Sequence, residues 1–311
     1  MAAPMNICIL GGTGFVGAAL LNRLAQAGHW VSVPTRDPER HAGLRVLPTV
    51  RLIRADIQDV RVLDRLVADA DAVINLVGIL NEHGHSTFQH VHVELTTKLI
   101  AALKAGRVRR LLHMSALGAD LEGPSRYLRS KGEAEAQIRA AAHVEFTIFR
   151  PSVIFGPGDT LTNRFAGLLR LSQGWLPLAR AGARFAPVYV GDVAEAFVRA
   201  LQQHETIAQT YELGGPQILT LEQLVRTTAA AAGLPCRIVR LPDALGRLQG
   251  AMLGRFPGKP FTLDNFRSLT RDSVCTEDGL QRLGISPRGM WEILPTYLAP
   301  PRPTLTVAAQ R

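Results

Sequence analysis

Cysteines are few in this sequence, and long uninterrupted apolar runs are absent. The three cysteines, Cys8, Cys236 and Cys275, lie far apart and form no CxxC pair. Neither a disulfide framework nor a zinc site is therefore indicated, and Cys8 is expected to be a small core residue. The longest apolar runs, such as 71–80, stop well short of the roughly 20 residues that cross a bilayer, so no membrane span is predicted.

A signal peptide and nucleic-acid-binding motifs are also lacking. Residues 1–5 show no basic segment followed by an apolar stretch, which predicts a cytoplasmic protein, with peripheral contact at the inner membrane left open. The arginines are scattered, without a helix-turn-helix, zinc finger or aromatic RNA-binding motif, so no nucleic-acid partner is expected. The formal charge of +9 is compatible with an anionic membrane or an acidic partner.

The chain does contain an alternation of short apolar strands and amphipathic helices. A hydrophobic content of 47% with 20% charged residues is enough for a large buried core. The expected strands lie at residues 6–10, 30–33, 50–54, 72–77, 110–114 and 145–149. This alternation is typical of βαβ units and predicts an α/β fold with a Rossmann-type, doubly wound parallel sheet.

A glycine-rich turn follows the first expected strand. The segment GGTGFVG at 11–17 opens a helix that ends near Gly28. Gly11 and Gly14 would let the backbone approach a pyrophosphate at the helix N-terminus, and Gly17 would permit close packing of helix on strand. A tight turn without ligand is the alternative. The residues predicted to bind a dinucleotide here are Gly11, Thr13, Gly14, Phe15, Val16 and Gly17.

The end of the second strand bears on the choice of dinucleotide. Arg36 stands where NAD enzymes usually place an acidic residue, and a guanidinium pairs well with a 2′-phosphate. NADP(H) is therefore favoured, although Asp37 could still serve NAD(H) and a surface arginine is the simpler alternative. Four further cofactor residues are placed by analogy, at the adenine edge and beneath the adenosine: Asp56, Ile57, Val77 and Gly78.

Three polar residues around the fifth strand form a candidate catalytic group. Ser115 ends that strand, and Tyr127 and Lys131 follow on the next helix at i and i+4, so they share one helix face. The ammonium is expected to lower the phenol pKa and prepare it for proton transfer with a carbinol or carbonyl. Ser115 would bind the same oxygen, and Lys131 would also hold the nicotinamide ribose. A solvated helix face is the alternative.

Four segments together resemble the extended or atypical short-chain dehydrogenase/reductase superfamily. They are GGTGFVG at 11–17, SALGA at 115–119, PSRYLRSK at 124–131 and FRPSVIFGPG at 149–158. Within it the chain is similar to bacterial relatives of the nucleotide-binding accessory subunit of respiratory complex I, often described as NAD-dependent epimerase/dehydratase. The resemblance extends to about Asp192. It implies an NADP(H) site that includes Pro151, and a role that is structural or quinone-related in that subgroup.

Two departures from the superfamily pattern bear on function. Sugar-nucleotide epimerases have a longer segment between the serine and the tyrosine, whereas only 116–126 separate them here, so a nucleotide-sugar substrate is not favoured. In many members an asparagine on the fourth helix supports a proton relay through water. His92 stands at that position, so efficient proton delivery is not implied.

The alternation of strands and helices becomes less regular after residue 155, and the expected domain organisation follows from this change. Residues 1–155 are expected to form an NAD(P)-binding Rossmann domain, with its sheet completed by about 186–213. Residues 156–185 and 214–298 are expected to form a smaller, interleaved C-terminal substrate or partner lobe, and 299–311 a flexible tail.

Two other features invite a binding interpretation. The histidines at 83, 85, 90 and 92 lack a matching set of ligands, so a solvated loop is preferred to a metal site. Residues 244–256 resemble a basic amphipathic helix that could contact anionic lipid or an acidic partner. A helix that packs on its own lobe is the alternative, and its glycines weaken an isolated helix.

Three functions remain open at this point. The first is an NADP-dependent oxidoreductase that acts on the carbonyl or alcohol of a small molecule whose identity the sequence does not show. The second is a non-catalytic nucleotide-binding accessory protein of complex I or of quinone-related respiratory metabolism. The third is an NADP(H)-sensing regulator. The retained Ser115, Tyr127 and Lys131 favour the first.

Overall fold

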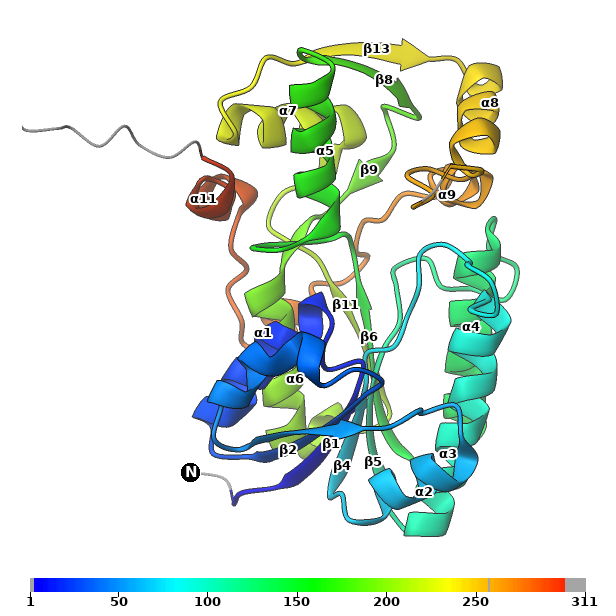
Figure 1. Cartoon of the computed structure of the whole chain (residues 1–311), viewed down its shortest axis with the longest axis vertical. Helices are drawn as coiled ribbons and strands as arrows, with labels where there is room; N and C mark the ends of the chain where they lie inside the picture. The colour runs from blue at the N-terminus through cyan, green and yellow to red at the C-terminus, as the bar shows by residue number, and fades with distance from the viewer. Residues whose placement is uncertain (1–2, 257, 300–311) are drawn as a thin grey trace, which may run out of the picture.

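A computed structural model describes residues 3–256 and 258–299 of the chain (Figure 1). Seven parallel strands form the main sheet, in the order β11-β6-β5-β4-β1-β2-β3. They are β1 (Asn6–Leu10), β2 (Trp30–Thr35), β3 (Val50–Arg54), β4 (Ala72–Asn75), β5 (Arg110–Met114), β6 (Glu145–Pro151) and β11 (Gln209–Leu213). The predicted α/β fold and all six predicted strands are confirmed.

Helices cover both faces of this sheet, and each face has its own apolar core (Figure 1). One face carries α1 (Phe15–Gln26) and α6 (Val190–Gln202), and the other carries α2 (Val60–Ala68), α3 (Leu95–Gly106) and α4 (Arg126–Ala140). Successive side chains of β1 alternate between the two cores, Ile7 and Ile9 on one side, Cys8 and Leu10 on the other. Cys8 is therefore a core residue, as predicted.

The order of the strands fixes where a ligand can bind. The chain runs outward from β1 to β2 and β3, and then returns to place β4, β5 and β6 on the other side of β1. The carboxyl ends of β1 and β4 are neighbours, so the crossovers leaving them diverge and open a crevice. Asn75 ends β4 two residues earlier than predicted, because its side-chain Oδ1 accepts the N–H of Val77.

Most of the remaining elements lie toward one end of the long axis of the molecule (Figure 1), whereas α10 (Gly279–Arg282) packs against β11 of the main sheet. The remaining strands form three short pairs, β7 with β10, β9 with β12 and β8 with β13. The strands are β7 (Ile154–Phe155), β8 (Trp175–Ala179), β9 (Arg184–Phe185), β10 (Val188–Tyr189), β12 (Leu219–Thr220) and β13 (Arg237–Leu241). The other helices are α5 (Thr160–Leu171), α7 (Leu221–Ala231), α8 (Asp243–Leu253), α9 (Leu263–Ser268), α11 (Met290–Ile293) and α12 (Pro295–Leu298).

An ion pair with a buried carboxylate joins the last described segment to α6. The Asp192 carboxylate accepts three bonds from Arg288, one from its backbone N–H at 2.8 Å and two from its guanidinium at 2.9 and 2.7 Å. None of the helices in the described part of the chain is long and apolar enough to span a bilayer. The predicted flexible tail lies, after Ala299, outside the described residues.

Candidate functional site

The glycine-rich turn stands at the crevice between β1 and β4. Gly11 has φ +78°, and a Cβ there would lie 3.1 Å from the backbone of Leu76 and Val77, so only glycine fits without strain. The Gly14 N–H donates to the Gly11 carbonyl at 3.0 Å, and Gly14 then caps α1 without any side-chain acceptor. The first N–H groups of α1 are therefore free to bind an anion.

The other residues predicted for this turn lie where an anion could reach their backbone. Thr13 is a partly buried turn residue, and Phe15 and Val16 are the first two residues of α1. Gly17 lies directly against the turn, since a Cβ would come within 2.6 Å of Gly12 Cα. The packing that Gly17 permits holds the N-terminus of α1 over the end of β1.

A hollow of about 550 Å³ opens at the ends of β2 and β3. It is lined by Arg36, Ile53, Arg54, Ala55, Asp56, Val62, Arg65 and Leu66. Its walls combine apolar side chains with three guanidinium groups, a combination suited to a flat base and a phosphate. The neighbouring Asp37 is not part of the lining, and its carboxylate accepts the Arg40 N–H at 3.3 Å.

Two of the adenosine residues placed by analogy differ in position. Asp56 lines the hollow, whereas Ile57 is partly buried against the core between the sheet and α2. Arg54 and Arg65 were not predicted from the sequence. Arg54 sits at the end of β3, and Arg65 on α2 reaches the hollow only because that helix folds back along the sheet.

The loop after β4 passes close to the candidate catalytic lysine. Val77 is partly buried beside this loop, and Gly78 is so close to α4 that a Cβ would lie 3.2 Å from Lys131 Nζ. Pro151 is the last residue of β6, and its carbonyl accepts the Leu117 N–H at 3.0 Å. The loop after β4 and the end of β6 therefore border the same edge of the sheet.

Ser115 and Lys131 meet at the carboxyl end of β5. The Lys131 ammonium is buried and donates to the carbonyl of Met114, the residue just before Ser115, at 3.1 Å. Burial lowers the pKa of Lys131 to about 8. Ser115 is 3% exposed, and its Oγ has no hydrogen-bond partner among the described residues. A buried hydroxyl without a partner is uncommon in a native protein, so this Oγ is available for a hydrogen bond to a bound oxygen atom.

Tyr127 lies one turn before Lys131 on α4. Its ring is partly buried and packs edge-on against Phe88 and His92, with centroids 5.8 Å away in each case. Burial raises the pKa of Tyr127 to about 12. The expected lowering by the ammonium is wrong for this structure, because the phenol is buried against Phe88 and His92 and the Lys131 ammonium binds the Met114 carbonyl.

His92, which stands where many members of the superfamily that the chain resembles have an asparagine, is buried within the site. It lies on a π-helical turn (Gln89–Glu94) and is 2% exposed. Its Nε2 accepts the Ile79 N–H at 3.1 Å, and its Nδ1 lies 2.8 Å from Ser130 Oγ. The pKa of His92 is lowered to about 2, mainly by burial and further by the charges of Lys131 and His113. The solvated loop predicted for the histidine cluster is wrong for His92.

The rest of that histidine cluster behaves differently. His83 and His85 are exposed in a turn, as predicted. His90 is partly buried and pairs with Glu94 at 2.9 Å. Within 3–256 and 258–299, no group of three or more potential metal ligands comes together. A signal for His92 did exist, since it stands between Val91 and Val93 on a helical run, and both valines are buried.

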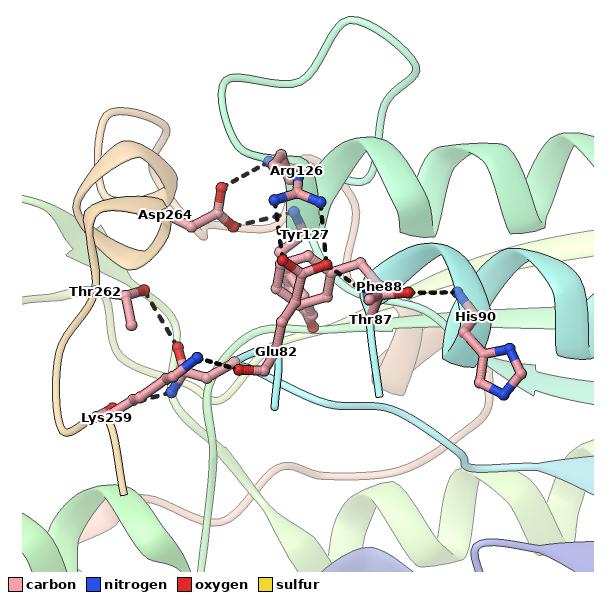
Figure 2. A network of polar contacts seen from close by, with 10 residues as sticks. Glu82, Thr87, Phe88, His90, Arg126, Tyr127, Lys259, Thr262 and Asp264 are labelled. Carbon is pink, nitrogen blue, oxygen red and sulfur yellow. Dashed lines mark hydrogen bonds and ion pairs between the residues drawn. The ribbon is translucent and has the colours of Figure 1, made fainter. Parts of the chain in front are cut away.

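Segments of the second half of the chain contact the first turn of α4. Figure 2 shows Asp264 accepting the backbone N–H groups of Arg126 and Tyr127, at 2.8 and 3.1 Å. The guanidinium of Arg126 pairs with Glu82 at 2.9 Å, and the Lys259 ammonium donates to the Glu82 carbonyl. These contacts border Tyr127 with polar groups from three separate segments.

The sequence model of the NAD dependent epimerase/dehydratase family matches residues 7–214, more than half of the chain. The chain belongs to this family and has its NAD(P)-binding Rossmann fold.

Two curated relatives and one solved structure show how far the similarity extends. The chain is 33% identical over 289 residues to NADH dehydrogenase [ubiquinone] 1 alpha subcomplex subunit 9, mitochondrial, from Arabidopsis thaliana, with 88% of this chain and 71% of that protein covered. It is 31% identical over 246 residues to ceramide reductase from Caulobacter vibrioides (strain NA1000 / CB15N), with 76% and 74% covered. MoeE5 in complex with UDP-glucuronic acid and NAD has the same fold, with a TM-score of 0.72, 18% identity and coverage of 94% and 97%.

Proposed function

We propose that this protein is an NADP(H)-dependent oxidoreductase that reduces a carbonyl group or oxidises the corresponding alcohol. The observation that carries the proposal is the unpartnered, buried Oγ of Ser115, beside the carbonyl that anchors Lys131. Leaving such a hydroxyl without a partner costs about 1–3 kcal/mol. A substrate oxygen bound to Ser115 would remove that cost.

The residues of the site have separate tasks in this reaction. The turn at 11–17 and Lys131 would hold NADPH, which would supply the hydride when bound. Ser115 donates a hydrogen bond to the carbonyl oxygen, and the Tyr127 phenol gives that oxygen its proton. The raised pKa of about 12 keeps the phenol protonated and ready to act as an acid. Lys131, with a pKa of about 8, is mostly charged at neutral pH and stabilises the phenolate that remains.

The hollow beyond β2 and β3 supports NADP(H) over NAD(H). Arg36, Arg54 and Arg65 all line it, and only one carboxylate, that of Asp56, faces them. A 2′-phosphate there would find charge-assisted donors. Asp37, the residue that would suit the ribose of NAD, binds the backbone of Arg40 instead.

The domain boundaries and the class of substrate belong to the same proposal. Residues 1–155, with 186–213, bind the nucleotide, and 156–185 with 214–298 bind the substrate. The short segment 116–126 disfavours a nucleotide sugar. Similarity to a ceramide reductase supports a carbonyl group carried on a long apolar chain.

The test begins with protein purified without added nucleotide. The denatured protein is analysed for released dinucleotide, and native protein is mixed with NADPH and a panel of ketones, quinones and long-chain carbonyl compounds. Tyr127→Phe should abolish turnover and leave the affinity for NADPH unchanged, while Tyr189→Phe, in the second half of the chain, serves as the matched control. Loss of NADPH binding in Tyr127→Phe would give the tyrosine a structural role instead.

A second candidate is a nucleotide-binding subunit of a respiratory complex that does not turn over substrate. The similarity to a mitochondrial NADH dehydrogenase subunit over 88% of the chain favours it, and the net charge of +9 supports peripheral association with an anionic membrane or with such a complex. Stoichiometric, tightly held nucleotide that stays inert with every compound of the panel would select this role over the oxidoreductase.

A further inference from the structure

Helix α8 is packed with its apolar side chains turned outward. Gly246 and Gly250 form its inner face, where added Cβ atoms would lie 2.8 Å from Ala179 Cβ and 3.1 Å from Leu263 N. Leu245, Leu248 and Met252 recur at helical spacing on the other side, and are 50%, 54% and 54% exposed. A helix on the surface of a globular protein normally turns its apolar side chains toward the core and its polar side chains toward water.

Further exposed apolar side chains stand on the segments that adjoin α8. Phe256, just after α8, is 57% exposed, and Trp175 and Val239 are 52% and 44% exposed on the adjoining strands β8 and β13. The side chain of Gln249 on α8 binds the carbonyl of Pro177 on β8 at 3.2 Å, so helix and strands adjoin. The three elements lie at the end of the molecule remote from the main sheet (Figure 1).

Between the flanking residues Asp243 and Asp264, the segment that forms α8 and the loop after it carries charges of one sign. Between residues 244 and 263 the only charged residues are Arg247, Arg255 and Lys259. Neither arginine pairs with any carboxylate in the described ranges. On β13, Arg237 stacks over the Trp175 ring at 5.3 Å. Arginines at the rim of an apolar face can extend their guanidinium groups to lipid phosphates, and tryptophan favours the interface between membrane and water.

We propose that the α8 surface, defined as Trp175, Val239, Leu245, Leu248, Met252 and Phe256 with Arg237, Arg247 and Arg255, docks on an anionic lipid bilayer. The helix lies parallel to the membrane, with its leucines among the acyl chains and its arginines at the phosphates. The proposal rests on the proposed peripheral membrane association and is independent of the oxidoreductase activity. An anionic bilayer satisfies both the apolar band and the excess of arginines.

The test uses the full chain with sedimented vesicles of two compositions, phosphatidylcholine with phosphatidylglycerol and phosphatidylcholine alone. Wild-type protein should bind the mixed vesicles, and added salt should weaken that binding. Leu248→Ser with Met252→Ser should reduce binding about tenfold or more. Arg247→Gln and Arg255→Gln should each reduce it about fivefold. These side chains are exposed, so the melting temperature should stay at the wild-type value.

Matched controls separate the surface from general properties of the chain. Val46→Ser removes an apolar side chain that is 80% exposed in the nucleotide-binding half, and Arg51→Gln removes an exposed arginine on β3. Both should bind like wild type. Failure of wild type to bind anionic vesicles would overturn membrane association itself. If the double variant Leu248→Ser with Met252→Ser bound vesicles like wild type, the membrane contact would not lie at α8, and only that assignment would be overturned. Two other results would overturn the bilayer as the occupant of this surface. They are the formation of a dimer, or retention on an acidic protein, in place of vesicle binding and dependent on Leu248.

Discussion

His92 provides a test of the site that needs no substrate. Because Nε2 accepts the Ile79 N–H, the ring proton is on Nδ1 and is donated to Ser130 Oγ, which in turn donates to the Tyr127 carbonyl at 2.8 Å. A second ring proton would point at the Ile79 N–H. The neutral ring therefore connects the loop after β4 to the helix that carries Tyr127, and burial holds its pKa at about 2.

The pH dependence follows from this lowered pKa. The unfolded chain binds a proton at His92 below about pH 6.5, whereas the folded chain does not, so folding loses stability as the pH falls. Between about pH 7.5 and about pH 5.5 the loss from this residue is about 1.4 kcal/mol. His92→Phe keeps a ring but leaves the partly buried Ile79 N–H without an acceptor, which costs about 1–3 kcal/mol at the higher pH.

The assay is urea unfolding of wild type and His92→Phe at both pH values, with equal m-values as a check on the denatured state. The stability gap between the two proteins should narrow by about 1.4 kcal/mol at the lower pH, because the variant has no histidine to protonate at this position. His85→Asn, at an exposed histidine, should show no such change. A gap of equal size at both pH values would refute a buried, neutral His92.

Three further variants test separate parts of the molecule. Arg36→Ala should weaken NADPH binding by about 1.5–3 kcal/mol and leave NADH binding nearly unchanged; equal losses in titrations with the two nucleotides would contradict the 2′-phosphate assignment. Gly17→Ala should lower stability by about 3 kcal/mol in thermal unfolding, because its Cβ would overlap the preceding turn. Gly43→Ala, where nothing lies within 4 Å of the new Cβ, is its control. Asp264→Ala should lower stability by about 1 kcal/mol and any turnover with it, since the backbone N–H of Tyr127 loses its acceptor; turnover at the wild-type rate would show that this cap does not position the phenol.

The parts of the fold that were predictable depend on neighbours in sequence. Alternating apolar residues located all six strands, and the glycine-rich turn identified the crevice, because a strand, a turn and a helix follow one another directly. The end of β4 was misplaced, since it depends on one side-chain bond from Asn75 to the Val77 N–H. Hydrophobicity continues through Val77 although the strand does not.

The missed parts of the site depend on residues that are distant in sequence. His92 is buried because Ser130, 38 positions away, accepts its ring proton. The phenol pKa of Tyr127 was predicted in the wrong direction, since the sequence does not show that the Lys131 ammonium binds the Met114 carbonyl. Asp264 lies 137 positions from Tyr127, and no local pattern connects an aspartate on one short helix to the start of another.

One segment of the C-terminal half connects the α8 surface to the candidate catalytic tyrosine. The inner face of α8 rests on the start of α9 through Gly250, and α9 presents Asp264 to the Tyr127 N–H. The same segment binds the loop after β4, where the Asn265 side chain donates to the Leu80 carbonyl at 3.3 Å and Lys259 to that of Glu82. A continuous set of contacts therefore runs from the inner face of α8, through α9 and the Asp264 side chain, to the first turn of α4. The surface proposed to meet a membrane and the phenol proposed to deliver a proton are in this way connected through one segment, and each is testable without the other.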